Sequence, residues 1–330
     1  MAEKKKINWL LILQGWAILW VVIGHAFLGE AGKGPEWENA LFHFAYSFHM
    51  PLFMLVSGWL FYLTRLKANN LKMRQQSSYN QIVKDKALRL LLPGFVFSLV
   101  ALAVKVAIPG EVSRQVGLSF REILHSYLYP YDNPLRELWF IATLFLFFVL
   151  TPLWKLVLSK RWVMWLMVAV LTAFHFWHPN TEFLCIGRVF RYAIWFYLGL
   201  VICKEEIAED LFDWKPWVTL LVGVAVYVAG KYSLSFITTF GGIILSFAIA
   251  LIADKYIPKL FFSFRNYTYQ IFLWGIFAQM AVKIAYRHIE MPYLVAYIIC
   301  ILVGLYVPVL VAKIVEKINW KPLSLCYGLK

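Results

Sequence analysis

The stretch INWLLILQGWAILWVVIGHAFLG, residues 7–29, contains no lysine, arginine, aspartate or glutamate. A helix of about 20 apolar residues covers the hydrocarbon core of a bilayer, so this stretch predicts a membrane-spanning helix. The remainder of the chain continues the pattern. It has 330 residues, of which 62% are hydrophobic and 15% charged, and its mean hydropathy is +0.67. Soluble domains are nearer about half apolar and a quarter charged, so the sequence favours an integral membrane protein.

Apolar blocks of similar length recur along the whole chain. We expect spans at residues 7–29, 39–63, 87–108, 136–157, 162–178, 184–203, 215–230, 233–253, 265–286 and 292–315. The expected fold class is therefore all-α, a polytopic membrane protein with about ten transmembrane helices. Residues 1–330 are expected to form a single membrane domain. Residues 64–86 are its main cytoplasmic loop and residues 109–135 its main external loop.

Basic residues fall mainly in alternate loops, as the positive-inside rule describes. Lys4, Lys5 and Lys6 precede the first span, and the loop at residues 64–86 is rich in lysine and arginine. The opposite loops are acidic or mixed, beginning with Glu30 and Glu36. This pattern predicts that both termini are cytoplasmic. The net charge of +14 is then explained by orientation and by contact with anionic membrane lipids, and no nucleic-acid partner is expected.

Ionisable side chains within the expected spans are candidate functional groups, because they are costly in lipid. His25 and His43 lie in the outer halves of the first two spans, with His49 nearer the middle, and Arg188 and Arg191 share one face of the sixth. The alternatives are helix–helix hydrogen bonds for the histidines, and snorkelling or pairing with Glu182 for the arginines. Neither these histidines nor the four scattered cysteines have the spacing of a metal site, and no metal is expected.

A second group of cations lies at the cytoplasmic side of the third span. Lys86 and Arg89 are three residues apart and precede Pro93. Together with Arg65, Lys84 and Arg265 they suit an anion-binding pocket, and the alternative is simple positive-inside anchoring.

Two motifs carry a family resemblance. LQGWAILWVVIGHA (residues 13–26) and FHMPLFMLVSGWLF (residues 48–61) resemble the acyltransferase 3 family of bacterial membrane O-acyltransferases, especially its fucose 4-O-acetylase-like members. Weaker similarities follow in KALRLLLPGF (86–95), ELWFIATLF (137–145), FRYAIWFYLGL (190–200) and RNYTYQIFLWG (265–275). Three positions depart from the family pattern. Gln14 and Lys86 stand where the family usually has arginine, and Trp274 replaces a late histidine.

The resemblance implies transfer of an acyl group, by family habit acetyl, from acyl-CoA to a hydroxyl of a carbohydrate or lipid-linked glycan at the outer side. His25 is the expected general base, since histidine titrates near neutral pH. Gln14, Lys86 and Arg89 are expected to bind the donor, whose pantetheine arm would carry the thioester towards His25. The expected acceptor-binding or supporting residues are His43, His49, Trp139, Arg188 and Arg191, because aromatic faces and arginine forks suit sugars and carboxylates.

The implied co-substrate is acetyl-CoA or another acyl-CoA, without a permanently bound cofactor, and the implied location is the cytoplasmic membrane of a bacterium. A transporter, flippase or polysaccharide-export protein is the alternative, because polar groups on several spans also suit a substrate path. A membrane scaffold is a third reading, in which the histidines only pack. The sequence leaves the acceptor, the acyl length and a homo-oligomeric state open.

Overall fold

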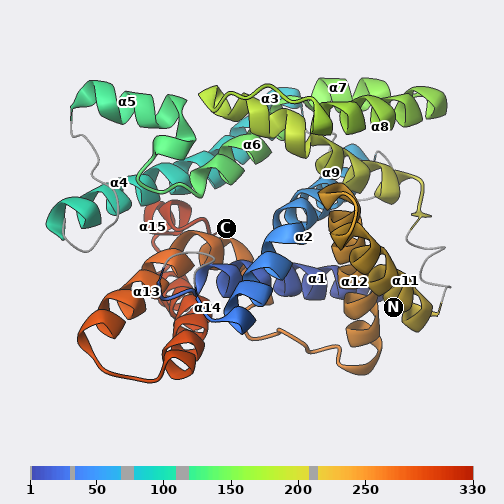
Figure 1. Ribbon diagram of the computed structural model, residues 1–330. Helices are drawn as coiled ribbons and strands as arrows, with labels where there is room; N and C mark the ends of the chain where they lie inside the picture. Colours follow the sequence, from blue (N-terminus) through green and yellow to red (C-terminus); the bar gives the residue numbers. More distant parts are fainter. Residues whose placement is uncertain (1, 30–33, 68–77, 109–118, 208–214, 330) are drawn as a thin grey trace. The chain divides into compact units, whose positions relative to one another are not determined.

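The computed structural model describes residues 2–29, 34–67, 78–108, 119–207 and 215–329, with residues 2–7 described by their backbone alone. These residues form helices and connecting turns, and no strand occurs among them. Parts of both expected loops, at residues 68–77 and 109–118, lie outside the described residues, as does Glu30. The α-helices (Figure 1) are α1 (Ala2–His25), α2 (Glu36–Phe61), α3 (Tyr79–Lys86), α4 (Leu92–Ala107), α5 (Phe120–Leu128), α6 (Leu138–Val149), α7 (Thr151–Val157), α8 (Arg161–Phe176), α9 (Ile186–Lys204), α11 (Pro216–Lys231), α12 (Ser235–Tyr256), α13 (Thr268–His288), α14 (Tyr293–Ile318) and α15 (Lys321–Cys326).

Short helical turns of other types join these helices. Two are π-helical, η1 (Tyr62–Leu66) and η2 (Ala87–Leu91), and continue α2 and α3 respectively. Three are 3₁₀ turns, η3 (Pro130–Asp132), η4 (Phe183–Cys185) and η5 (Arg265–Tyr267).

The prediction of an all-helical membrane fold is confirmed, and each of the ten expected spans is largely helical. Among the described residues six helical segments are long and apolar enough to cross a bilayer, or seven if α6 and α7, bent by 55°, count as one span. The six are Asn8–His25, Glu36–Leu66, Tyr79–Ala107, Phe183–Lys204, Ser235–Tyr256 and Tyr293–Ile318. The segments expected at 162–178, 215–230 and 265–286 form α8, α11 and α13, outside this set. The count of ten and the cytoplasmic termini stay predictions.

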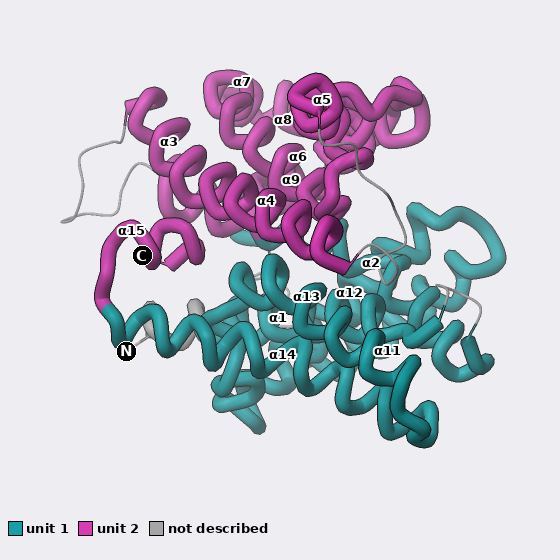
Figure 2. The backbone as a smooth tube through the Cα atoms, turned by 90° about the vertical axis from the view of Figure 1, so that its left-hand side faces the viewer, with its two compact units in different colours: residues 1–56, 206–318 teal, residues 57–205, 319–330 magenta. Residues whose placement is uncertain are grey.

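The helices group into two units that interleave along the chain (Figure 2). Unit 1 comprises residues 1–56 and 206–318, and unit 2 comprises residues 57–205 and 319–330. Helix α2 contributes to both, because the boundary falls between Val56 and Ser57. The single domain expected over residues 1–330 stays a prediction.

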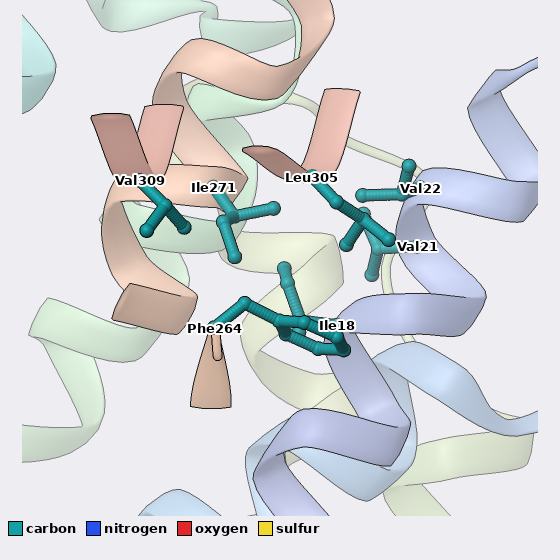
Figure 3. Close-up of a cluster of buried hydrophobic side chains, with 7 residues drawn as sticks. All are labelled: Ile18, Val21, Val22, Phe264, Ile271, Leu305 and Val309. Carbon is teal, nitrogen blue, oxygen red and sulfur yellow. The ribbon is translucent and has the colours of Figure 1, made fainter. Parts of the chain in front are cut away.

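Unit 1 is built on an apolar face of α1. Ile18, Val21 and Val22 recur at helical spacing. They pack against Phe264, the residue before η5, and against side chains of α13 and α14 (Figure 3). The buried cluster contains Ile18, Val21, Val22, Phe264, Ile271, Leu305 and Val309. Beside it α11 and α12 form a tightly packed pair, in which a Cβ atom at Gly241 would overlap the backbone of Tyr227. Small residues let helices approach this closely within a membrane.

Polar side chains hold the start of α1 to the segment before α13. The Asn8 amide donates to the Asp254 carboxylate and, at 3.1 Å, to the Pro258 carbonyl. Its oxygen accepts from an Arg265 terminal nitrogen at 2.8 Å. Arg265 is only 6% exposed and also donates to the carbonyls of Pro258 and Leu260. Asn8 thus connects the Asp254 carboxylate with the Arg265 guanidinium.

Asn8→Ala should destabilise unit 1, because it removes hydrogen bonds to two charged groups at once. Such a loss costs about 1–3 kcal/mol, so the unfolding temperature of the purified protein should fall by several degrees when followed by tryptophan fluorescence. The matched control is the exposed Asn266, whose replacement by alanine should leave the transition in place. Equal transitions in both variants would show that the Asn8 contacts contribute nothing.

Unit 2 has an aromatic core at the junction of α6, α7 and α9. The ring of Phe196 lies 5.0 Å from that of Phe147, 5.7 Å from Phe148 and 6.1 Å from Trp154, measured between centroids. Offset and edge-on aromatic pairs of this kind are favourable beyond the area they bury. The core therefore fixes α6 against α9, the two helices that carry Trp139 and Arg188.

Candidate active site

His25 is the last residue of α1 and faces α2. Its Nε2 atom lies 3.5 Å from the Tyr46 hydroxyl. The Tyr46 ring stacks on Phe42, with centroids 4.2 Å apart. A phenol oxygen near an imidazole nitrogen can orient that ring and stabilise its protonated form. Tyr46 is a site residue that the sequence did not reveal, since a tyrosine on an amphipathic span is usually an interface anchor.

His49 lies one turn beyond Tyr46 on α2 and is 2% exposed. Its Nδ1 atom is hydrogen-bonded to the Ala45 carbonyl. Because a carbonyl oxygen only accepts, Nδ1 carries the hydrogen and Nε2 of the neutral ring is left as an acceptor. The rings of Tyr46 and His49 meet edge-to-face at 4.9 Å. Tyr46 therefore contacts both histidines.

The two remaining candidates in unit 1 lie away from this pair. His43 is exposed, and its ring contacts that of its neighbour Phe42. Gln14 is half-buried on α1, about 16 Å from His25 along a helix that rises 1.5 Å per residue. Among the described residues no hydrogen bond joins either of them to His25.

Lys283 of α13 also belongs to the surroundings of His25, and the sequence analysis did not single it out. Its Nζ atom lies 3.8 Å from the centroid of the ring of Phe27, the second residue after His25 in the chain. The signal was present in the sequence as a lysine inside the apolar segment 265–286, where charges are costly.

The cations expected to bind the donor lie in unit 2, beside two π-helical turns. Arg65 is on η1 and Arg89 on η2, which begins directly after Lys86. The Lys86 ammonium lies 3.8 Å from the centroid of Phe148 and 5.6 Å from that of Phe61. Both arginines interact electrostatically with Lys86. Extra helical residues of this π type occur frequently at functional sites.

The structure gives this basic group one close acidic partner. Arg65 forms an ion pair with Asp85 at 2.9 Å, whereas Arg89 and Lys84 are exposed. Arg265, which the sequence grouped with them, belongs to unit 1 and donates there to Asn8 and to backbone carbonyls. The basic group of unit 2 is therefore Arg65, Lys86 and Arg89, with the charge of Arg65 largely balanced.

Trp139 and Arg188 are brought together in unit 2. The Arg188 guanidinium lies 4.7 Å from the Trp139 ring centroid and 5.3 Å from that of Tyr131. Tyr192 lies against Trp139, with centroids 5.2 Å apart. Arg188 also pairs with Glu182 at 3.4 Å, which confirms the alternative given for this arginine. Arg136 lies over the other ring of this cluster, 4.1 Å from the Tyr131 centroid. The cluster therefore combines aromatic faces with two cations and one carboxylate.

Arg191 does not share these contacts. Its side chain is exposed, and its carbonyl accepts a hydrogen bond from His175 Nδ1 at 2.6 Å. The chain enters α9 through Leu184 and Cys185, both with left-handed backbone, at φ 49° and 57°. Such conformations cost about 1–3 kcal/mol in non-glycine residues and concentrate at functional sites. They lie directly before the turn that carries Arg188.

No group of three or more histidine, cysteine, aspartate or glutamate side chains that could hold a metal ion occurs in the described part of the chain.

Comparison with known proteins adds the family. Residues 7–313 match the acyltransferase 3 family, described as an acyltransferase domain. The nodulation protein NolL of Mesorhizobium japonicum is 27% identical over 220 residues, which cover 65% of this chain and 53% of that protein. The chain thus spans about half the length of this curated relative. No solved structure matches it. Its apolar helices and this match make it a multi-pass membrane protein, and it is a member of the acyltransferase 3 family.

Proposed function

We propose that the protein is a membrane O-acyltransferase that moves an acetyl group from acetyl-CoA to a hydroxyl of a carbohydrate or lipid-linked glycan. The observation that carries the proposal is His25 at the end of α1, beside the Tyr46 hydroxyl and backed by the buried His49. An alcohol is a weak nucleophile at neutral pH, and a positioned histidine can take its proton as the new bond forms. The family match supports acyl transfer as the reaction class.

The donor is assigned to the basic group of unit 2. Coenzyme A carries several phosphate charges, and lysine and arginine are the side chains that bind phosphate. We assign the phosphates to Lys86 and Arg89, because in the described residues the ion pair of this group is formed by Arg65 with Asp85. Gln14 carries no charge, so in this proposal it contributes a hydrogen bond at most.

The acceptor is assigned to Trp139 and Arg188. A flat aromatic face stacks on the C–H surface of a sugar ring, while the paired Arg188 and Glu182 offer donors and acceptors to its hydroxyls. His49 acts as a support for Tyr46. The organism of the matched relative and the positive-inside pattern favour a bacterial cytoplasmic membrane, with the acceptor presented from the outer side.

The test is acyl transfer by purified protein in lipid nanodiscs, supplied with radiolabelled acetyl-CoA and methyl α-L-fucoside or other methyl glycosides. We expect a labelled sugar ester and one free CoA thiol for each ester formed. Loss of the ester after mild alkali would identify it as an O-acetyl group. Failure to form an ester with any glycoside, together with saturable uptake of a glycolipid into vesicles, would favour the transporter instead.

Trp139→Ala should raise the acceptor KM by about tenfold, since an aromatic face is worth about 1.4 kcal/mol or more in such a site. CoA binding by the same variant should be unchanged. The matched control is Trp162→Ala, which removes an exposed tryptophan of the same unit and should leave both constants unaltered. An unchanged acceptor KM in Trp139→Ala would remove this residue from the acceptor site.

A further inference from the structure

The end of α1 that carries His25 is held by side chains from α13 and α14. The last carbonyls of a helix lack partners within it and need them from elsewhere. The Gln279 amide, 2% exposed, donates to the Val22 carbonyl at 2.8 Å. The Tyr297 hydroxyl donates to the Ile23 carbonyl at 3.3 Å. A Cβ atom on Gly304 would lie 2.8 Å from Gln279 Cγ, so the glycine makes room for this contact.

The same face of α13 places a cation beside the base. Lys283 is four residues beyond Gln279 and therefore one turn further along that face. Its ammonium nitrogen lies 3.8 Å from the centroid of the Phe27 ring. Phe27 is the second residue after His25 in the chain. The Phe27 ring meets Phe42 edge-on at 6.2 Å, and Phe42 stacks on Tyr46. A series of contacts thus leads from Lys283 through Phe27, Phe42 and Tyr46 to His25.

A lysine that only anchored the outer end of α13 would extend its ammonium towards the lipid headgroups. The Lys283 side chain is instead half-buried, and its ammonium lies over the Phe27 ring. Gln279 holds the preceding turn of α13 against α1. The position of the Lys283 ammonium relative to His25 is therefore set by helix packing as well as by the rotamer of Lys283. Preorganised charge is what a reaction with a charged transition state requires.

We propose that Lys283 supplies the positive charge that stabilises the oxyanion formed beside His25 during acyl transfer. This inference rests on the proposed function. The acceptor oxygen bonds to the thioester carbonyl carbon, its proton passes to His25, and the carbonyl π electrons move to oxygen. Lys283 interacts with that oxyanion. When the intermediate collapses, the carbon–sulfur bond breaks and the thiolate takes the proton from His25, which gives the ester and free CoA thiol.

The test compares Lys283→Met, Lys283→Arg and the control Lys231→Met, which removes an exposed lysine of the same unit. Methionine keeps the apolar stem over Phe27 and removes the charge. We expect kcat to fall about 100-fold in Lys283→Met, within the range for loss of one oxyanion-stabilising group, with both KM values within threefold of wild type. The kcat of Lys283→Arg should be at least tenfold higher than that of Lys283→Met. The kcat of Lys231→Met should equal that of wild type.

Three results would overturn the role of Lys283. The first is a kcat of Lys283→Met near that of wild type. The second is a raised acceptor KM of Lys283→Met with an unchanged kcat. The third is a kcat of Lys283→Arg as low as that of Lys283→Met, although the unfolding temperature of Lys283→Arg equals that of wild type. In each of these cases wild-type protein still transfers acetyl groups, and His25→Gln transfers them far more slowly. An inactive wild type would instead refute the proposed function itself, so the two failures are distinguishable.

Discussion

His25→Gln protein should transfer acetyl groups about 10²–10⁴-fold more slowly than wild type, which is the usual contribution of a general base. Glutamine keeps the side chain polar and close to the size of imidazole, but it cannot take a proton at neutral pH. The contact with Tyr46 at 3.5 Å is within reach of an amide, so the fold around α1 should persist. The loss should appear in kcat, because the imidazole acts on the reacting proton rather than on ground-state binding.

The measurement is the initial rate of ester formation in nanodiscs, with acetyl-CoA and acceptor both varied. His288→Gln is the matched control, since it removes an exposed histidine at the end of α13 and should retain the wild-type rate. CoA binding by His25→Gln should equal that of wild type, because the donor phosphates are assigned to unit 2. Transfer by His25→Gln within threefold of wild type would contradict the role of His25 as base.

The sequence predicted the parts of the site that depend on position along one helix. The motif at residues 48–61 placed His49 on α2, and the family resemblance singled out His25. The hydrophobic blocks located the helices that carry the other candidate residues, because the length of an apolar run is a local property. Helix α3, which ends at Lys86, lies instead in the segment 64–86 that was expected to be a loop. Helical spacing also put Arg188 one turn from Arg191, but spacing could not tell that only Arg188 meets Trp139 and Tyr131.

The parts that depend on contacts between distant segments could not be read in the same way. Tyr46 and Lys283 become site residues because α2 and α13 pack beside the end of α1, and no local pattern encodes that choice of neighbour. Arg265 has the composition of an anion-binding residue, yet its donors go to Asn8 and to two carbonyls. From the sequence alone, an arginine is equally compatible with anion binding and with structural hydrogen bonds of this kind. Packing decides between them.

The Lys86→Met/Arg89→Met protein should bind CoA about 100-fold more weakly than wild type at low salt. Each lost charged hydrogen bond to phosphate is worth about 1.5–3 kcal/mol, and tenfold in affinity corresponds to about 1.4 kcal/mol. Titration calorimetry in nanodiscs measures the affinity. Wild-type affinity should fall as salt rises, because exposed charges such as Arg89 are screened, and the double variant should lose most of this dependence.

Lys155→Met/Lys160→Met is the matched control, since it removes two exposed cations from the same unit and should bind CoA as wild type does. An equal affinity in the Lys86→Met/Arg89→Met protein would show that these residues only anchor the chain to the membrane.

Lys86→Arg separates a phosphate-binding role from a purely structural one. In the free protein the Lys86 ammonium lies over Phe148 and near Phe61, an interaction worth about 0.5–2 kcal/mol. Arginine stacks on aromatic rings at least as well and adds a planar fork for phosphate, and it is the residue that the family usually has here. Lys86→Arg should therefore keep the stability of unit 2 and bind CoA as tightly as wild type or more tightly. If Lys86 served only to pack on Phe148, Lys86→Met would lower the unfolding temperature and leave CoA affinity unchanged, and Lys86→Arg would leave both unchanged.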